Sequence, residues 1–251
     1  MIGILIIGDE ILSGKRQDKH FAKAVEILGA RGLELAWAQY LGDDPAFITA
    51  TLRRTLATTD IVFSFGGIGA TPDDHTRQCA AAALGRELAA HPDGLKELEA
   101  RFPNDPAQIT PHRVNMVTFP VGSSIIPNPF NRIPGFSVNS HYFVPGFPEM
   151  AWPMMEWVLD TKYAHLHRAV KPLEEAIIVQ VGESKLIDIM DAVVRDYPDL
   201  KLASLPQNVD GGYRVELSVR GDPARVPIAM AYVRAEVAKL GYDFTDRPPR
   251  R

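Results

Sequence analysis

The sequence predicts an α/β fold with a mostly parallel sheet, followed by a smaller α+β unit. The segment "IGILIIG" at residues 2–8 is continuously apolar, as expected for a strand buried on both faces of a parallel sheet. Strand and helix patterns then alternate as far as Gly85, which indicates right-handed crossovers between parallel strands. Beyond residue 170 the order becomes strand, helix, two strands and helix, which predicts a separate α+β unit.

Hydrophobic periodicity and helix-end residues define the elements of the first part of the chain. The first long helix places Phe21, Val25 and Leu28 on one face. Asp44 and Pro45 are typical of the N-cap and the first position of the next helix. In chain order, the expected elements are a strand at residues 2–8, a helix at 18–32, a strand at 33–41, a helix at 42–60, a strand at 61–65 and a helix at 74–85.

The remaining chain comprises an irregular stretch and the second unit. The irregular stretch is expected to hold helices at residues 93–102, 112–119 and 149–160, a proline-rich loop at 128–135 and paired strands within 136–150. The second unit is expected to hold strands at 175–182, 200–207 and 213–221, helices at 183–198 and 223–241, a turn at 210–212 and a frayed tail, "DRPPRR". We therefore expect two domains, residues 1–168 and 172–246, divided within "HRAVKPLEE".

Composition excludes several classes of protein. Hydrophobic residues make up 46% of the 251, which is ordinary for a soluble globular chain. The formal net charge of -4 gives no basic field for nucleic acid or an anionic membrane. Cys79 is the only cysteine, so an intramolecular disulfide is impossible and a reducing compartment is favoured. No run approaches the roughly 18 apolar residues of a membrane span. We expect a cytoplasmic protein with neither a membrane nor a nucleic-acid partner.

The stretch "FSFGGIGATPDDHT" at residues 63–76 places three glycines at the end of a strand. Ligands of open parallel sheets bind beyond the carboxyl ends of the strands. Gly66, Gly67 and Gly69 allow backbone N–H groups to approach a ligand, and the following helix adds unpaired N–H groups and partial positive charge. Thr71 adds a hydroxyl donor. The loop is therefore predicted to bind an anion such as phosphate.

Two adjacent carboxylates follow this loop and would repel phosphate. In one interpretation, Asp73 or Asp74 caps the next helix and stabilises it by about 1 kcal/mol. In the other, a carboxylate holds a divalent cation that bridges to phosphate, or positions a water. The pattern is neither a Walker loop, because no Gly-Lys-Ser/Thr follows, nor a Gly-x-Gly-x-x-Gly signature.

The loop "GGIGATPDDHT" resembles the Gly-Gly-x-Gly-x-Thr-x-x-Asp-x-Thr loop of MoaB/Mog-type molybdopterin-binding domains. It is more similar still to the N-terminal domain of the competence/damage-inducible protein A (CinA) family. Four other segments agree in order and spacing: "IGDEILSGKRQDKHFAKAVEILGARG", "LGDDPAFITATLRRTL", "PNPFNRIPGF" and "VPGFPEM". The resemblance implies a three-layer α/β/α domain that binds a pterin phosphate or a nucleotide. The second unit resembles the KH-like middle domain of CinA proteins, and their amidohydrolase domain is expected to be absent.

The resemblance also assigns roles to particular residues. Asp74 matches the loop aspartate implicated in substrate handling by the molybdopterin adenylyltransferases, and Asp43 matches a second functional acid at the end of the second strand, so both are expected to be catalytic. Glu10 matches the acid after the first strand of CinA proteins. Gly146, in "VPGFPEM", is expected with Glu10, Asp73 and the glycine loop among the ligand-binding residues. Loop stabilisation remains an alternative for Asp43, and simple solvation an alternative for Glu10.

Some residues depart from the family pattern, and they leave the ligand open. Ile68 stands where many cofactor-biosynthesis members have threonine, and Ala70 where CinA proteins usually have proline. The first hypothesis is a domain that binds a pterin or nucleotide phosphate, in the manner of molybdopterin. The second is a hydrolase of a nucleotide diphosphate such as ADP-ribose or FAD, dependent on Mg²⁺, Mn²⁺ or Co²⁺. The third is a non-catalytic binding module. A small phosphate-bearing ligand and a homo-oligomer are expected in each case, and no metal ligands are assigned.

Overall fold

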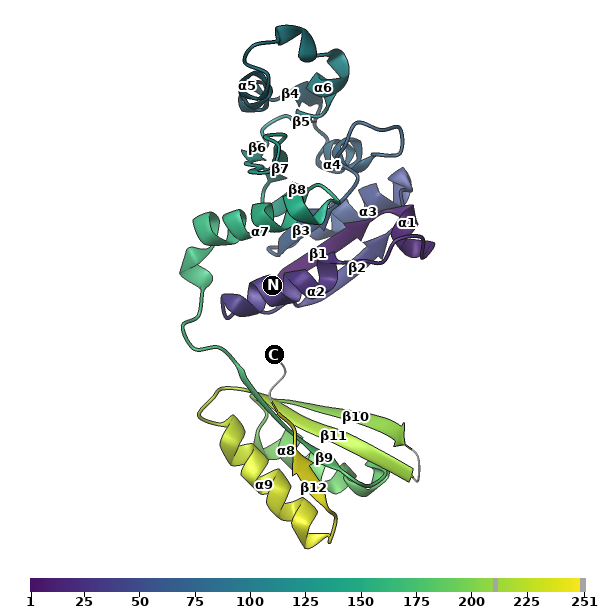
Figure 1. Ribbon diagram of the computed structural model, residues 1–251, viewed down its shortest axis with the longest axis vertical. Coiled ribbons are helices and arrows are strands. Elements are labelled where there is room, and N and C mark those ends of the chain that lie inside the picture. The colour runs from purple at the N-terminus through teal and green to yellow at the C-terminus, as the bar shows by residue number, and fades with distance from the viewer. Residues whose placement is uncertain (210–211, 249–251) are drawn as a thin grey trace. The chain divides into compact units, whose positions relative to one another are not determined.

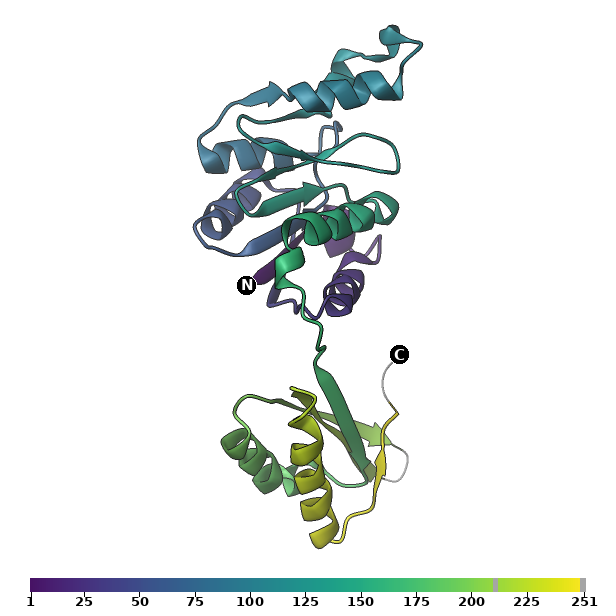
Figure 2. The ribbon, with the colours of Figure 1, turned by 90° about the vertical axis from the view of Figure 1, so that its left-hand side faces the viewer.

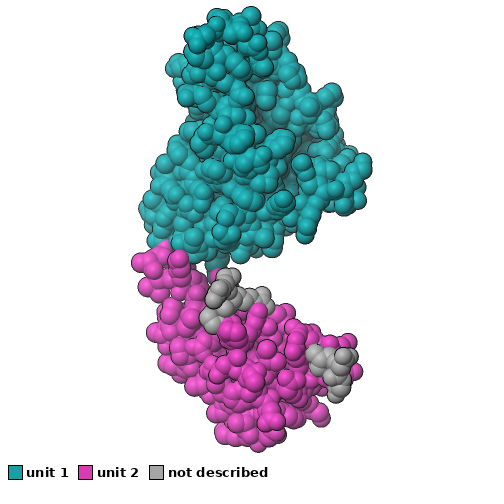
Figure 3. Space-filling model, in the orientation of Figure 1, with its two compact units in different colours: residues 1–167 teal, residues 168–251 magenta. Residues whose placement is uncertain are grey.

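The computed structural model describes residues 1–209 and 212–248, which form two compact units. Unit 1 comprises Met1–His167, and unit 2 begins at Arg168 (Figure 3). Each unit has a hydrophobic core of its own. Most of the expected turn at 210–212 and the last three residues of the expected tail lie outside the described residues.

The sheet of unit 1 has six strands in the order β2-β1-β3-β8-β7-β6 (Figure 1). Their bounds are β1 Ile2–Ile7, β2 Trp37–Leu41, β3 Ile61–Phe65, β6 Ser124–Ile126, β7 Gly135–Val138 and β8 His141–Val144. The first four strands of that order are parallel. β7 and β6 run antiparallel to their neighbours. The expectation of a mostly parallel sheet is confirmed.

Helices cover both faces of this sheet, so the three-layer arrangement is confirmed (Figures 1 and 2). Helices α2 (His20–Ala30) and α7 (Pro148–Lys162) pack on the face that carries Ile4 and Phe63. Helices α3 (Pro45–Leu56) and α4 (Thr76–Leu84) pack on the face that carries Leu5 and Val62. Alternate residues of one strand thus enter opposite cores, which explains why the strands are apolar throughout.

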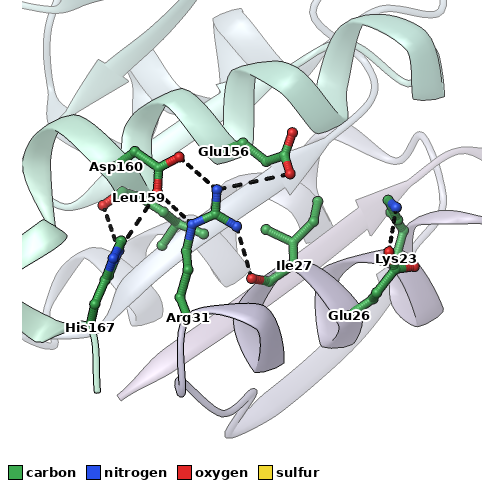
Figure 4. Close-up of polar contacts among 8 residues, drawn as sticks. All are labelled: Lys23, Glu26, Ile27, Arg31, Glu156, Leu159, Asp160 and His167. Atoms are coloured by element: carbon green, nitrogen blue, oxygen red, sulfur yellow. Dashed lines mark hydrogen bonds and ion pairs between the residues drawn. The ribbon is translucent and has the colours of Figure 1, made fainter. Parts of the chain in front are cut away.

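Local interactions set the ends of these helices. Asp44 is the N-cap of α3 and accepts a hydrogen bond from Phe47 N at 2.8 Å, with Pro45 at the first position, as predicted. Arg31, at the end of α2, joins this helix to α7. Its Nε and Nη2 donate to the two carboxylate oxygens of Asp160 at 2.6 and 2.7 Å, and Nη1 donates to Ile27 O (Figure 4).

The inward face of α2 differs from the prediction. The buried residues are His20, Ala24, Ile27 and Leu28, whereas Phe21 and Val25 are exposed. The buried stripe, which includes Ala24, Ile27 and Leu28, is rotated from the predicted stripe by about one position, or roughly 100° around the helix. The prediction for Phe21 and Val25 was wrong because their larger apolar side chains outweighed those of His20 and Ala24 in the pattern.

Only the first part of the irregular stretch belongs to a small lobe beside the sheet, which comprises residues 88–120, whereas its later part supplies β6, β7, β8 and α7 (Figure 1). Residues 112–119 are not one helix, because α6 ends at Asn115 and the chain turns into a strand. This strand pairs antiparallel with another that the sequence pattern did not indicate. The lobe comprises β4 Leu88–Ala90, α5 Pro92–Arg101, the 3-10 helix Pro106–Gln108, α6 Pro111–Asn115 and β5 Thr118–Pro120.

Unit 2 is an antiparallel sheet in the order β10-β11-β9-β12 with two helices, which confirms the additional α+β unit. Its elements are β9 Leu173–Val179, α8 Ile187–Asp196, β10 Lys201–Val209, β11 Gly212–Gly221, α9 Val226–Lys239 and β12 Phe244–Asp246. The described part of the expected tail is not frayed, because Asp246 lies in β12 and Arg247 N donates to Ala176 O at 2.9 Å.

None of the helices in the described part of the chain is both long and apolar enough to cross a membrane.

Candidate functional site

A cavity of about 410 Å³ lies at the carboxyl ends of β1, β3 and β8 in unit 1. This is the edge at which parallel sheets bind their ligands. The turns after these strands bring together residues that are more than 130 positions apart in the sequence. All nine residues that the sequence nominated line this cavity: Glu10, Asp43, Gly66, Gly67, Gly69, Thr71, Asp73, Asp74 and Gly146.

The beginning of α4 fixes the carbonyl groups of the glycine loop. Thr76 Oγ1 donates to Gly66 O at 3.1 Å, and Thr76 N donates to Gly67 O at 2.9 Å. Arg77 Nη2 donates to Gly69 O at 2.6 Å. The left-handed φ angles of Gly66 and Gly67, 99° and 69°, allow this course of the backbone. The loop is therefore held from the helix side.

Arg77, which the sequence did not single out, is 1% exposed and joins the loop to the lobe. Its Nη1 donates to Asn115 O at the end of α6 and to Thr118 O in β5. Burial lowers the pKa of this guanidinium, and the negative charge of Asp74 opposes that shift. A buried cation therefore lies behind the glycine loop.

Neither Asp73 nor Asp74 caps α4. The N-cap is His75, and its side chain makes no capping hydrogen bond. Asp74 Oδ2 instead accepts hydrogen bonds from Thr71 N, at 2.9 Å, and from the Thr71 hydroxyl. Asp74 thus closes the glycine loop on itself, whereas the side chain of Asp73 is exposed.

Asp43 joins the turns that follow β1 and β2. Its Oδ2 accepts a hydrogen bond from Asp9 N at 2.8 Å, and its own N donates to Asp9 Oδ1 at 3.1 Å. Burial is the main cause that raises the pKa of Asp43, and the negative charges of Asp9, Glu10 and Asp73 add to it. The Asp9 N–H bond acts in the opposite direction. The carboxylate both stabilises a loop and lies among like charges.

Glu10 lies in the short helix α1 (Asp9–Leu12) and Gly146 in the turn after β8, and both approach the glycine loop. Glu10 Oε1 lies 3.9 Å from Arg16 Nη1, and both side chains are about half exposed. Such a solvated pair contributes little stability, on the order of 0–1 kcal/mol. Gly146 lies against the first loop glycine, because a Cβ at this position would be 3.5 Å from Gly66 Cα.

Sequence reasoning missed several other lining residues. Asn128 and Asn131 lie in the proline-rich loop, and His112 lies in α6. Asn128 Nδ2 donates to Asn131 Oδ1 and to Ile133 O, both at 2.9 Å, so these amides shape the loop itself. Two asparagines three positions apart in a proline-rich segment were the available indication.

A metal ion in this cavity would need ligands from a bound phosphate as well as from the protein. Among the described residues, no three His, Cys, Asp or Glu side chains are grouped to hold a metal ion. Mg²⁺ in phosphate sites is often held by one or two carboxylates together with waters and substrate phosphates. Asp43 and Asp74 each use Oδ2 for a backbone hydrogen bond, so each has a second oxygen for such a role. The residues therefore fit a shared site rather than a complete protein cage.

Comparisons with known proteins agree with this architecture. Residues 3–165 match the model of the family described as "Probable molybdopterin binding domain". A "CinA-like protein" of Anaeromyxobacter sp. (strain Fw109-5) is 35% identical over 170 residues, which are 66% of this chain and 42% of that protein. A "CinA-like protein" of Syntrophotalea carbinolica is 29% identical over 223 residues, 86% of this chain and 51% of that protein.

A solved structure shows the same fold. The crystal structure of the protein CinA from Thermoplasma acidophilum superimposes with a TM-score of 0.56 and 26% identity, over 63% of this chain and 96% of that chain. The chain spans about half or less of the length of the two curated relatives. The resemblance that the glycine loop and four other segments indicated is confirmed. Since the family model covers well over half of the residues, the chain belongs to the probable molybdopterin binding domain family.

Proposed function

We propose that the cavity of unit 1 binds the phosphate of a pterin or nucleotide on the glycine loop. The observation that carries this proposal is the direction of three peptide groups. In a trans peptide the N–H points away from the carbonyl of the preceding residue. Because α4 holds the carbonyls of Gly66, Gly67 and Gly69, the N–H groups of the next residue in each case point away from α4.

These three N–H groups belong to Gly67, Ile68 and Ala70, which all line the cavity. Within residues 1–209 and 212–248, they meet no protein acceptor. Successive N–H groups of this kind form a concavity that binds anions. The buried charge of Arg77 behind the loop adds attraction for an anion.

The identity of the ligand rests on similarity. The family model is described as a molybdopterin binding domain, and a pterin phosphate carries the anion that the loop requires. A nucleotide carries the same group. Ile68 supplies no hydroxyl to the loop, and the Thr71 hydroxyl already donates to Asp74 Oδ2, so the proposal depends on backbone donors.

The test removes one support of the loop without adding volume. Thr76→Val deletes the hydroxyl that holds Gly66 O, and we expect about tenfold weaker binding of ADP and of a pterin diphosphate by calorimetry. Thr51→Val is the control, because Thr51 is also buried in a helix but lies on α3, where its hydroxyl does not hold the glycine loop. Equal affinities in both variants, or no binding by the wild type, would contradict the proposal.

The acidic side of the cavity favours a second candidate function, a metal-dependent hydrolase of nucleotide diphosphates. Asp43, Asp73 and Asp74 would repel a bare phosphate, whereas a divalent cation between acid and phosphate removes that repulsion. In the reaction, one water would attack a phosphorus atom of ADP-ribose or FAD and the P–O–P bridge would break. Each product would carry a phosphate monoester.

Three substitutions separate charge from geometry. Asn in place of Asp43 or Asp74 keeps an oxygen for the backbone hydrogen bond but removes the charge. Each is expected to abolish turnover with Mg²⁺, Mn²⁺ or Co²⁺ and to leave the melting temperature within a few degrees of wild type. The loss of ligand-binding free energy in the double variant should be smaller than the sum of the losses in the two single variants, because the two acids act together. Asp73→Asn, whose side chain is exposed, is expected to be milder. Unchanged metal-dependent turnover in Asp74→Asn would exclude this carboxylate from catalysis. Absence of turnover by the wild type with all three metals would leave a non-catalytic binding module.

A further inference from the structure

A second cavity of about 680 Å³ adjoins the first one, and it has no assigned role. Five residues line both cavities: Ile7, Glu10, Arg16, Gly146 and Phe147. We infer that this second cavity holds the heteroaromatic ring of the ligand whose phosphate lies on the glycine loop. The inference rests on the proposed function, and it names the part of the ligand that a phosphate site alone does not recognise.

The wall between the cavities is thin and firmly held. Gly146 has no side chain and lies against Gly66, so only backbone separates its turn from the glycine loop. His20 Nε2 lies 3.2 Å from Gly146 O, and the His20 ring stacks on Phe65 with centroids 4.6 Å apart. A ligand on the loop therefore begins within reach of the second cavity.

The tautomer of His20 follows from its other partner. Trp152 Nε1 can only donate, and it lies 3.3 Å from His20 Nδ1, so Nδ1 accepts. Burial lowers the pKa of His20, which favours the neutral ring. Nε2 then carries the hydrogen and donates to Gly146 O. The turn that begins α7 is thus fixed by a buried hydrogen-bond chain, and the cavity wall is a built feature.

The lining suits a planar ring with polar edges. Phe147 is 50% exposed and lines both cavities, so its ring is open to a stacking partner. Trp152 lines the second cavity from α7. Lys19 and Glu149 add one cation and one acid beside these apolar groups. A cavity of this size, mostly apolar with a few polar groups, is typical of a small-molecule site. A purine base and a pterin share this chemistry.

Calorimetry with three diphosphates tests the inference: methyl diphosphate without a ring, ADP, and hydroxymethylpterin diphosphate. We expect at least one ring-bearing probe to bind wild type about tenfold or more tighter than methyl diphosphate, because stacking strengthens binding. Which of the two gains more identifies the ring. Phe147→Ala is expected to erase the gain of the ring-bearing probes, so that all three probes bind the variant with affinities within about twofold of one another.

The variant is expected to fold, because the Phe147 contacts that begin α7 use its carbonyl, which accepts from Met150 N and Ala151 N. Phe47→Ala is the matched control, since Phe47 is 52% exposed but lines neither cavity. Equal binding of all three probes to wild type, or an equal loss for all three in Phe147→Ala, would overturn the ring site alone. Failure of methyl diphosphate and both other probes to bind wild type would overturn the phosphate site as well.

Discussion

Carboxylates occupy two contrasting environments in unit 1. Between α2 and α7, Asp160 receives two hydrogen bonds from Arg31, and this is the main cause that lowers the pKa of Asp160 (Figure 4). At the cavity, Asp43 lies near Asp9, Glu10 and Asp73, and burial together with these charges raises its pKa. One acid is stabilised in its charged form by a partner, and the other is destabilised by its surroundings.

The difference between Asp160 and Asp43 indicates what each acid contributes. A paired acid on a helix surface stabilises the fold and needs no ligand to explain it. An acid held among like charges costs stability, and such perturbed groups gather at functional sites. Asp43 is therefore more informative about function than Asp160, although each of the two residues takes part in two hydrogen bonds.

Breaking the Arg31–Asp160 pair should have the largest effect on stability. Arg31→Met removes two charged hydrogen bonds from a side chain that is only 13% exposed. We expect a loss of about 2 kcal/mol in the free energy of unfolding, measured by urea denaturation. Glu26→Gln is the control, because it breaks only the exposed Lys23–Glu26 pair in the same view (Figure 4), with an expected loss below about 0.5 kcal/mol. Equal losses would make the two pairs equivalent.

Removing the charge of Asp43 should have a smaller effect, with the opposite sign. A raised folded-state pKa gives a contribution to stability that is present below the unfolded-state value and is lost as the pH rises through the folded-state value. Asn does not ionise, so Asp43→Asn avoids this loss. Its melting temperature at pH 7 is expected to equal or slightly exceed that of wild type, and the difference should vanish in acid. A fall of several degrees at pH 7 would mean that loop stabilisation dominates at Asp43.

The smallest effect concerns the protonation of Asp160 in the Arg31–Asp160 pair at low pH. A lowered folded-state pKa gives stability that is present above the unfolded-state value and is lost as the pH falls through the folded-state value. The gap in melting temperature between wild type and Arg31→Met should therefore narrow below about pH 4, where Asp160 begins to be protonated in the unfolded chain. A constant gap from pH 7 to pH 3 would assign the effect of Arg31 to packing and to its bond with Ile27 O.

The sheet could be predicted from the sequence because its strands contact two cores. Leu5 and Ile4 enter opposite layers, so the apolar run has no polar alternation and is easily recognised. The face of α2 could not be predicted in the same way. Histidine is a polar residue type, so the pattern does not mark His20 as buried. Its partners in the core, Phe65 and Trp152, are 45 and 132 positions away along the chain.

The candidate site also contains residues that the sequence could predict and residues that it could not. The nominated residues all lie in segments that directly follow strands, so topology alone brings them to one edge of the sheet. Arg77 was missed because a lone arginine in an alanine-rich helix predicts a solvated side chain. Its partners Asn115 and Thr118 become neighbours only when the lobe folds back over α4. Capping of α4 was a reasonable expectation, but Thr71 offers Asp74 two donors within the loop itself.

The crowding around the glycine loop has a consequence for the evolution of this family. A Cβ at Gly66 would lie 2.4 Å from Ile7 O, and one at Gly67 would lie 2.2 Å from Thr76 Oγ1, with no ligand involved. Folding alone therefore disfavours any residue other than glycine at these two positions. Changes of ligand preference during divergence are expected instead at an exposed side chain that lines both cavities, such as Phe147.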